Sequence, residues 1–550
     1  MFLSVKISPR LPPSLVIVLT LLTWVVPGAA RAQTNDSPTD PAALIREQGL
    51  TSNSQAMATL SYLSDVIGAR LTGSPNLRRA NDWTRAKLES WGLTNAHLEA
   101  WGPFGRGWEL KHFSAQIVAP YVFPLIACPQ AWSPGLPRTL TANVIYMGDV
   151  TEPNLNTYKG KLSGAIVLIT PMREIPERYD PLVTRQSDSN LVSLANATGV
   201  PRGPGAPRPV SAPGTNGPPN VFRMLAFLQK EKAALAVAES FSGEGGTVFV
   251  ASALVPYTNI FAPGLQYTPA YAFKVPPIPP QITLATEDYN RLVRMIRQGI
   301  PLKMEVDLKV KFHDEDRMAY NTIAEIPGSD LKDQLVMLGG HLDSWQAGTG
   351  ATDNGAGVAA CMEAVRIIEA AHLRPRRTIR IALWTGEEQI GLGSLAYVSN
   401  HFGYFAGTNK FLIQGRRAQL VRGPEFDQLS AYFNLDNGAG KIRGIYTEDN
   451  EGAREIFRKW FEPFHSMGAE TVTLARTGST DHVSFDRIGL PGFQFIQDPL
   501  DYGTRSHHSN EDVFDRIQAD DLKQAATILA TFVYNAATLD TPIPRVELPE

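Results

Sequence analysis

Residues 335–345 read LVMLGGHLDSW, and this stretch decides which fold the rest of the chain is expected to adopt. Its first four residues are apolar, which is typical of a short buried strand. The strand runs into two glycines and then into His341, with Asp343 two residues further on. Because functional side chains of open α/β sheets collect at the carboxyl ends of strands, the stretch predicts a sheet that presents His341 at its edge.

A strand, loop and helix pattern repeats from residue 321 to about 537. Apolar strands are expected at 335–338, 378–384, 431–435 and 492–496, with intervening helices such as 357–371. Alternation of this kind predicts an α/β fold, in which a mixed sheet is flanked by helices.

The sequence changes character between residues 118 and 305. Buried strands are expected at 143–148 and 165–170, and a loop rich in proline and glycine then extends to about residue 220. This block is rich in strands and carries no cluster of catalytic residue types. We therefore expect a β-rich second domain that is inserted into the first or packed beside it.

The first 32 residues are predicted to be a secretory signal peptide. Lys6 and Arg10 supply the positive start, residues 14–26 are apolar, and residues 30–32 fit a cleavage site. The apolar run is shorter than the ~20 residues that span a bilayer, which favours cleavage over a membrane anchor. We expect an exported protein, secreted or periplasmic, with no stable membrane span after cleavage.

The composition excludes several classes of protein. Hydrophobic residues make up 43% of the chain and charged residues 19%, a globular profile. The net charge of −3 gives no reason to expect a nucleic-acid partner. The two cysteines, Cys128 and Cys361, could pair in an oxidising compartment, but Cys361 stands in a helical pattern where a buried free thiol fits equally well. We interpret both as structural and leave their pairing open.

Acidic and histidine residues follow several of the predicted strands. They are His341, Asp353, the pair Glu387 and Glu388, Asp436, and the pair His507 and His508. Each has an ordinary explanation alone, because paired acids suit a helix start and an Asp-Asn-Gly sequence suits a turn. Together they form a mixed nitrogen and oxygen set of the kind that binds Zn²⁺.

At these residues the chain resembles the dizinc exopeptidases that include bacterial aminopeptidases and glutamate-carboxypeptidase-like enzymes, and above all their carboxypeptidase Q branch. The motifs are GHLDSW at 340–345, GATD at 350–353, LWTGEEQ at 383–389 and HHS at 507–509, with a glycine-rich turn at 67–74. The combined spacing is highly specific, and the resemblance covers nearly all of the mature chain.

The resemblance implies two Zn²⁺ ions per chain and a set of five ligands. His341 and Asp436 would hold one ion. Glu388 and His508 would hold the other ion, and Asp353 would bridge the two.

The resemblance also implies roles for the residues around the ligands. Glu387 would be the general base, and Asp343 would support His341. The peptide bond between Asp353 and Asn354 would be cis. The middle block would be a protease-associated domain, a non-catalytic insert. The predicted divisions are then a signal peptide at 1–32, the catalytic domain at 33–117 and 306–540, the protease-associated domain at 118–305, and a tail at 541–550.

Three features depart from the pattern of the family. Asn354 stands where the carboxypeptidase Q branch has an acid, and His507 stands where related aminopeptidases often have tyrosine. The loop at 202–219 has no counterpart that we recognise. These differences affect the expected substrate preference and leave the ligand set intact.

The function implied is that of a zinc-dependent exopeptidase, which hydrolyses peptides or dipeptides with a metal-activated water. Two alternatives stay open: a glutaminyl-cyclase-like transferase with a single zinc, and a non-catalytic receptor-like relative. The partner expected is a peptide substrate. Aminopeptidase, carboxypeptidase and dipeptidase action all remain open, as do side-chain preference, the metal used in the cell and the oligomeric state, for which a homodimer is one option.

Overall fold

The computed structural model describes residues 40–198, 220–257, 267–406 and 419–547. The predicted signal peptide at 1–32 and the loop at 202–219 lie outside these ranges. Within them, no helix combines the length and the apolar character that a membrane crossing requires.

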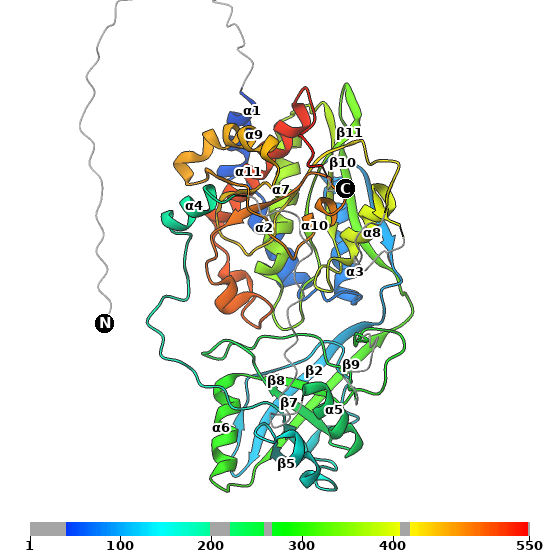
Figure 1. The fold of residues 1–550 in the computed structure, drawn as a ribbon, viewed down its shortest axis with the longest axis vertical. Coiled ribbons are helices and arrows are strands. Elements are labelled where there is room, and N and C mark those ends of the chain that lie inside the picture. Colours follow the sequence, from blue (N-terminus) through cyan, green and yellow to red (C-terminus); the bar gives the residue numbers. More distant parts are fainter. Residues whose placement is uncertain (1–39, 199–219, 258–266, 407–418, 548–550) are drawn as a thin grey trace, which may run out of the picture. The chain divides into compact units, whose positions relative to one another are not determined.

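The candidate site residues belong to a mixed sheet of eight strands within the described ranges (Figure 1). From edge to edge the strands are β1 (Thr94–Trp101), β10 (Ala319–Ile326), β12 (Arg377–Trp384), β11 (Leu331–His341), β15 (Leu429–Asn434), β18 (Gly492–Gln497), β16 (Ile442–Tyr446) and β17 (Thr471–Thr473). The neighbours β12, β11, β15 and β18 are parallel, whereas β1, β10 and β12 pair in antiparallel fashion. This arrangement confirms the predicted fold class and places the carboxyl ends of four adjacent strands at one edge of the sheet.

The central strands of this main sheet are buried on both faces. In β11, Val336 and Leu338 pack into one core, whereas Leu335 and Met337 pack into the core on the other face. Burial on both faces explains why the strand is a continuous apolar run in the sequence. The first core is completed by α7 (Ala356–Ala370) and α11 (Ala519–Thr538), and the second by α8 (Leu392–His401) and α10 (His482–Asp486).

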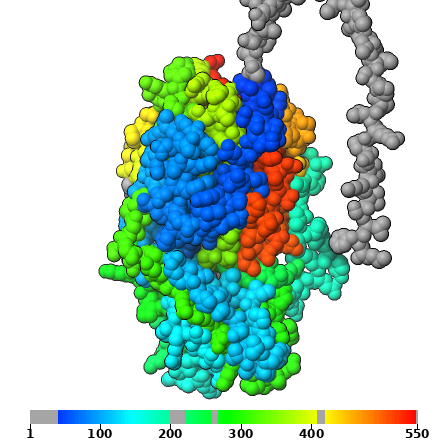
Figure 2. Space-filling view, turned by 180° about the vertical axis from the view of Figure 1, so that it is seen from behind, coloured from blue at the N-terminus to red at the C-terminus, as the bar shows by residue number. Residues whose placement is uncertain are grey.

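The N-terminal helices extend the first core. They are α1 (Pro41–Leu50), α2 (Ala56–Ser61), the π-helical turn η1 (Tyr62–Ile67) and α3 (Pro75–Ser90). Ile45, Leu60 and Leu77 are buried in the same core as α11, and Figure 2 shows this blue segment beside the orange-red C-terminal helix. α3 begins where the Ser74 side chain accepts a hydrogen bond from the Leu77 N–H, with Pro75 at its first position.

A second sheet is built from residues 107–313, which lie between β1 and β10 in the chain and which we call the insert. Its strands, in spatial order, are β3 (Phe123–Pro124), β2 (Gly107–Ala119), β9 (Lys303–His313), β5 (Leu140–Tyr146), β6 (Ile166–Leu168), β7 (Leu235–Glu239), β8 (Gln281–Leu284) and β4 (Ala127–Pro129). The helices α5 (Val221–Lys230) and α6 (Thr286–Arg297) cover opposite faces of this sheet. The domain boundaries predicted at residues 118 and 305 fall inside the long antiparallel pair of β2 and β9.

The remaining elements lie outside the two eight-stranded sheets. They are η2 (Glu152–Tyr158), α4 (Asp188–Ala195), η3 (Ala351–Gly355), β13 (Gly403–Phe405), β14 (Leu420–Arg422), α9 (Glu451–Phe461), η4 (Glu462–Met467), η5 (Tyr502–Ser506) and η6 (Phe514–Arg516). β13 and β14 form a separate antiparallel pair. Cys128 is half-buried and Cys361 is buried, and both are free thiols, so the structure does not pair them.

Candidate metal centre

The ends of the four parallel strands bring the predicted site residues together. These residues are His341 at the end of β11, Asp353 in the η3 turn that follows, Glu387 and Glu388 after β12, Asp436 after β15, and His508 after η5 in the loop that follows β18. The adjacency of these strands is what gathers side chains that are far apart in the sequence.

One group of ligand atoms surrounds His341. Its Nε2 atom lies 3.2 Å from Asp353 Oδ1 and 3.4 Å from Asp436 Oδ1. The three residues are buried, and their ligand atoms all lie within 4.8 Å of one another. Tetrahedral Zn²⁺ with Zn–N and Zn–O distances of about 2.0–2.2 Å separates its ligand atoms by roughly 3.3–3.6 Å. This group therefore has the spacing that one zinc ion requires.

A second group surrounds His508. Its Nε2 atom lies 2.9 Å from Glu388 Oε2 and 3.2 Å from Asp353 Oδ2. His507 also approaches, with its Nε2 atom 3.8 Å from the same Asp353 oxygen. The ligand atoms of Asp353, His507 and His508 lie within 4.8 Å of one another. This group could hold a second cation.

The Asp353 carboxylate is shared between the two groups. Its Oδ1 atom faces His341 and its Oδ2 atom faces His508, each at 3.2 Å from the imidazole Nε2. Several buried oxygens here, Asp353 Oδ2, Glu388 Oε1 and Asp436 Oδ1, accept no hydrogen bond from the described residues. Buried polar atoms without a partner are costly, and cations between these oxygens would supply the missing partners. The donor set therefore fits a pair of metal ions.

Several carboxylates of the site lie close together and are buried away from water, and both conditions shift their pKa values. Burial raises the pKa of Glu388 to about 7, and the nearby Asp353 carboxylate adds to the shift while His508 opposes it. Burial also raises the pKa of Glu387 well above its usual range. For Asp353, burial acts in the same direction, but the close imidazole rings of His341 and His508 hold its pKa well below the usual range. Divalent cations would relieve this concentration of negative charge.

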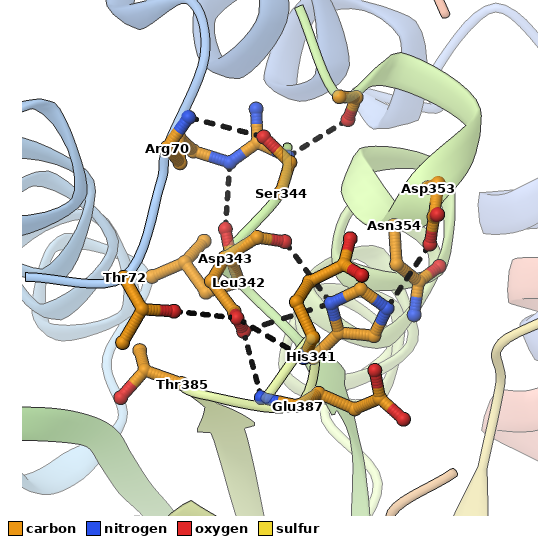
Figure 3. A network of polar contacts seen from close by, with 12 residues as sticks. Arg70, Thr72, His341, Leu342, Asp343, Ser344, Asp353, Asn354, Thr385 and Glu387 are labelled. Carbon is orange, nitrogen blue, oxygen red and sulfur yellow. Dashed lines mark hydrogen bonds and ion pairs between the residues drawn. The ribbon is translucent and has the colours of Figure 1, made fainter. Parts of the chain in front are cut away.

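Asp343 links two strand ends beside the site (Figure 3). Its Oδ2 atom accepts a hydrogen bond of 2.7 Å from the Thr72 hydroxyl, and the amide groups of Glu387 and Glu388 each donate to its carboxylate at 3.3 Å. The Nδ1 atom of His341 lies 3.0 Å from the Asp343 backbone carbonyl and 3.6 Å from its carboxylate. An Nδ1–H directed at this carbonyl leaves Nε2 with a lone pair for a metal. The contact expected between the two side chains is thus made mainly through the backbone.

Arg70 fixes the loops on either side of the site, a role that sequence reasoning did not assign (Figure 3). Its buried guanidinium donates to the backbone carbonyls of Leu342, Thr349 and Gly350 at 2.7, 2.8 and 2.7 Å. Its own amide donates to the Ser344 hydroxyl at 3.0 Å. The glycine-rich turn at 67–74 therefore braces both the His341 loop and the Asp353 loop.

Asn354 connects the bridging aspartate to the end of β15. The peptide bond between Asp353 and Asn354 is cis, as expected. The Asn354 side chain donates to the Leu435 carbonyl at 2.9 Å and accepts from the Gly357 N–H at 3.0 Å. An amide can do both, whereas an ionised acid at this position has no hydrogen to donate to Leu435. The departure to asparagine thus has a structural reason here.

A cavity of about 460 Å³ opens onto the two groups. Its walls include Asp353, Glu387, Glu388, Asp436, Asn437, Tyr502, His507 and His508. Glu387 reaches this cavity without taking part in either group of close ligand atoms among the described residues. A carboxylate in that position is available to exchange protons with a bound molecule.

His507 is a second residue to which the sequence assigns no definite role. It belongs to the candidate set only as the neighbour of His508, yet its ring lies 3.8 Å from the His508 ring and 4.5 Å from the Tyr502 ring, measured between centroids. The doubled histidine was the available signal. A pair of adjacent histidines in a polar loop is common at surfaces, so this signal could not separate ligand from neighbour.

The chain is similar to known peptidases. Residues 321–533 match peptidase family M28. The chain is 27% identical to carboxypeptidase Q of Bos taurus over 490 residues, which cover 88% of this chain and 86% of the relative. It is 26% identical to carboxypeptidase Q of Homo sapiens over 495 residues, with the same coverage of both chains.

Two solved structures share the fold. A peptidase M28 precursor from Shewanella amazonensis SB2B superposes with a TM-score of 0.61 and 22% identity over 92% of this chain and 98% of that chain. A zinc aminopeptidase from Bacillus subtilis gives a TM-score of 0.50 and 19% identity over 88% of this chain and 95% of that chain. These likenesses agree with the α/β architecture predicted from the sequence.

Proposed function

Because the chain is a zinc exopeptidase of peptidase family M28, we propose that it holds two Zn²⁺ ions at the ends of its parallel strands. His341 and Asp436 hold one ion, Glu388 and His508 hold the other, and Asp353 bridges them. The observation that carries this proposal is the shared carboxylate, whose two oxygens each lie 3.2 Å from a different imidazole.

The proposed reaction is hydrolysis of a peptide bond, with Glu387 as the general base. When bound, the two ions supply Lewis-acid polarisation of the scissile carbonyl and of the attacking water. Glu387 accepts a proton from that water and delivers it to the leaving amine. Burial raises the pKa of Glu387 well above its usual range, which suits a group that must take up a proton and hold it briefly. The Asp343 carboxylate accepts a hydrogen bond from the Glu387 N–H, and this bond holds the backbone of the proposed base beside the cavity.

The substrates proposed are short peptides or the ends of longer ones. A cavity of about 460 Å³ is within the range of small-ligand sites, about 300–1,000 Å³. The relatives called carboxypeptidase Q make removal of the C-terminal residue the first activity to assay. A peptide-library digest read by mass spectrometry would identify the trimmed end, and hydrolysis that persists after complete metal removal would exclude the proposed chemistry.

The proposal also covers export and the insert. Residues 1–32 would be removed as a signal peptide, leaving Gln33 as the first residue of a secreted or periplasmic protein. N-terminal sequencing of the exported protein tests this cleavage. The insert would act as a protease-associated domain that shapes access to the cavity and contributes no ligand.

A single-zinc transferase is the main alternative. It requires one metal ion per chain and cyclisation of an N-terminal glutamine, with no hydrolysis of peptide bonds. The presence of two histidine-centred groups around one carboxylate favours two ions. Metal analysis of the purified protein, combined with assays for both reactions, separates the two functions.

A further inference from the structure

The loop that carries His508 is hydrogen-bonded to the insert as a short antiparallel ladder. Phe249 of the insert pairs with Ser509. The Val250 N–H donates to the His508 carbonyl at 2.8 Å, and the Asn510 N–H donates to the Val248 carbonyl at 3.2 Å. Residues 248–250 of the insert are thus hydrogen-bonded directly to the loop that carries His508, a residue of the candidate metal centre.

The Asn510 side chain closes this ladder at its far end. Its Oδ1 atom accepts from the Val248 N–H at 2.7 Å, and its Nδ2 group donates to the Gly246 carbonyl at 3.2 Å. Asn510 therefore makes hydrogen bonds with both polar groups of its amide, and both partners belong to the insert. We call Asn510 together with residues 246–250 the clasp.

The backbone of His508 needs such support. Its φ angle is +60°, in the left-handed region that residues other than glycine rarely adopt. This conformation is unfavourable for an L-residue, and it persists where surrounding contacts dictate it. The Val250 N–H fixes the orientation of the His508 carbonyl and so opposes rotation of this residue out of its conformation.

The insert also supports the His508 ring, through Trp345. It lies against the Trp345 indole, with 5.8 Å between ring centroids. Trp345 in turn packs on the buried side chains of Val248 and Val250, and meets the Trp132 ring of the insert edge-on at 6.2 Å. Insert residues thus contact both the backbone and the aromatic neighbour of this histidine.

We propose that the clasp positions His508, so that docking of the insert and retention of the ion held by Glu388 and His508 are coupled. The inference rests on the ligand assignment proposed above. Asn510 is a positioning residue in this account, because it acts through His508. Coupling between two binding events is reciprocal. Loss of the clasp therefore lowers the affinity for the metal, and removal of the metal destabilises the clasp by the same free energy.

The test compares Asn510→Ala with a matched control, Gln346→Ala. The Gln346 side chain donates to the Pro129 carbonyl at 2.8 Å, another hydrogen bond to the insert, and this bond lies outside the ladder at residues 508–510. The readout is zinc retained per chain during titration with a chelator, measured by mass spectrometry. Loss of outer-shell partners weakens metal affinity about 10- to 100-fold. We expect a loss of this size for one ion in N510A, an unchanged second ion, and wild-type behaviour in Q346A.

Two further variants keep the outcome decisive. Asn510→Asp retains an oxygen that accepts the Val248 N–H, so it should retain zinc better than N510A if hydrogen bonding is what matters. His508→Ala should lose one ion outright. If H508A loses an ion while N510A matches Q346A, the clasp does not position His508. If H508A keeps both ions, the ligand assignment itself is wrong.

Hydrogen exchange tests the coupling without any variant. The amide hydrogens of Val248, Val250 and Asn510 are the donors of the ladder or of its closing bond. We expect these amides to exchange faster in chelator-treated protein than in zinc-loaded protein, while amides in the β2–β9 pair stay unchanged. Equal exchange at the clasp with and without zinc would overturn the proposed coupling.

Discussion

Replacement of His401 by glutamine should remove a pH-dependent part of the stability of the main sheet. His401 ends α8, and its two ring nitrogens each lie 2.9 Å from a carboxylate, Nδ1 from Glu425 and Nε2 from Glu99. Burial alone would lower the pKa of His401, but hydrogen bonds and charge interactions with Glu425 and Glu99 raise it to about 9 from 6.5. The folded protein therefore binds this proton more tightly than the unfolded chain does.

The size of the effect follows from that pKa difference. A shift from 6.5 to about 9 corresponds to about 3 kcal/mol, at 1.36 kcal/mol for each pKa unit. The side chain of His401 is 26% exposed, so solvent screens the interaction only in part. The pKa of Glu425 is lowered both by His401 and by Arg380, and the share due to His401 is the same interaction seen from its other partner. Because the folded pKa is raised, this stability is present below pH 6.5 and is lost as the pH rises through about 9.

The assay is denaturant unfolding of zinc-loaded wild type and H401Q at pH 6.5 and pH 9.5. Between these pH values the wild type should lose about 3 kcal/mol more of its free energy of unfolding than the variant does. Comparison with the variant cancels the titration of every other group. Equal losses in both proteins would show that His401 is not held in its charged form by these carboxylates.

Three further substitutions address the site and its supports. Glu387→Gln should lower kcat by about 10²- to 10⁴-fold with zinc content unchanged; full activity would remove Glu387 from the mechanism. Thr72→Val deletes the donor to the buried Asp343 carboxylate and should cost about 1–3 kcal/mol in denaturant unfolding, and no loss would contradict that role. Gly357→Ala places a Cβ 2.2 Å from the Leu435 carbonyl and should lower both stability and zinc affinity, whereas Gly503→Ala, with no atom within 4 Å, serves as its silent control.

The strands and the residues that follow them could be predicted because local sequence determines where each strand ends. β11, β12, β15 and β18 are buried along most of their length, so each appears as a mainly apolar segment whose end is easily located. Because neighbouring parallel strands end at the same edge of a sheet, residues that directly follow these strands are expected to lie close together. That is why His341, Asp353 and Asp436 could be placed at one end of the sheet from the sequence, whereas their expected division between two ions came from the family resemblance.

The supports of the site could not be predicted because they depend on contacts between distant segments. Arg70 meets the Thr349 and Gly350 carbonyls about 280 residues away, and no local pattern signals such a partner. The boundaries predicted at residues 118 and 305 lie inside β2 and β9, because the alternating pattern of a long strand gives no local sign of where a domain begins. The ladder between Asn510 and Val248 likewise leaves no trace in either segment's own sequence.

His401 illustrates a third limit of sequence reasoning. It lies outside the family motifs quoted above, so the sequence alone assigns it no role. Its charge state is set by Glu99 and Glu425, which come from separate segments of the chain. A raised pKa of this kind can be recognised only once the fold has brought the partners together.

The most direct test of the two-ion centre is a crystal structure of the zinc-loaded protein with anomalous data at the zinc edge. The proposal predicts two anomalous peaks about 3.5–4 Å apart, one on each side of the Asp353 carboxylate. One peak should lie beside His341 and Asp436, and the other beside Glu388 and His508. A single peak, or peaks away from Asp353, would contradict the shared-carboxylate centre on which the proposed function depends.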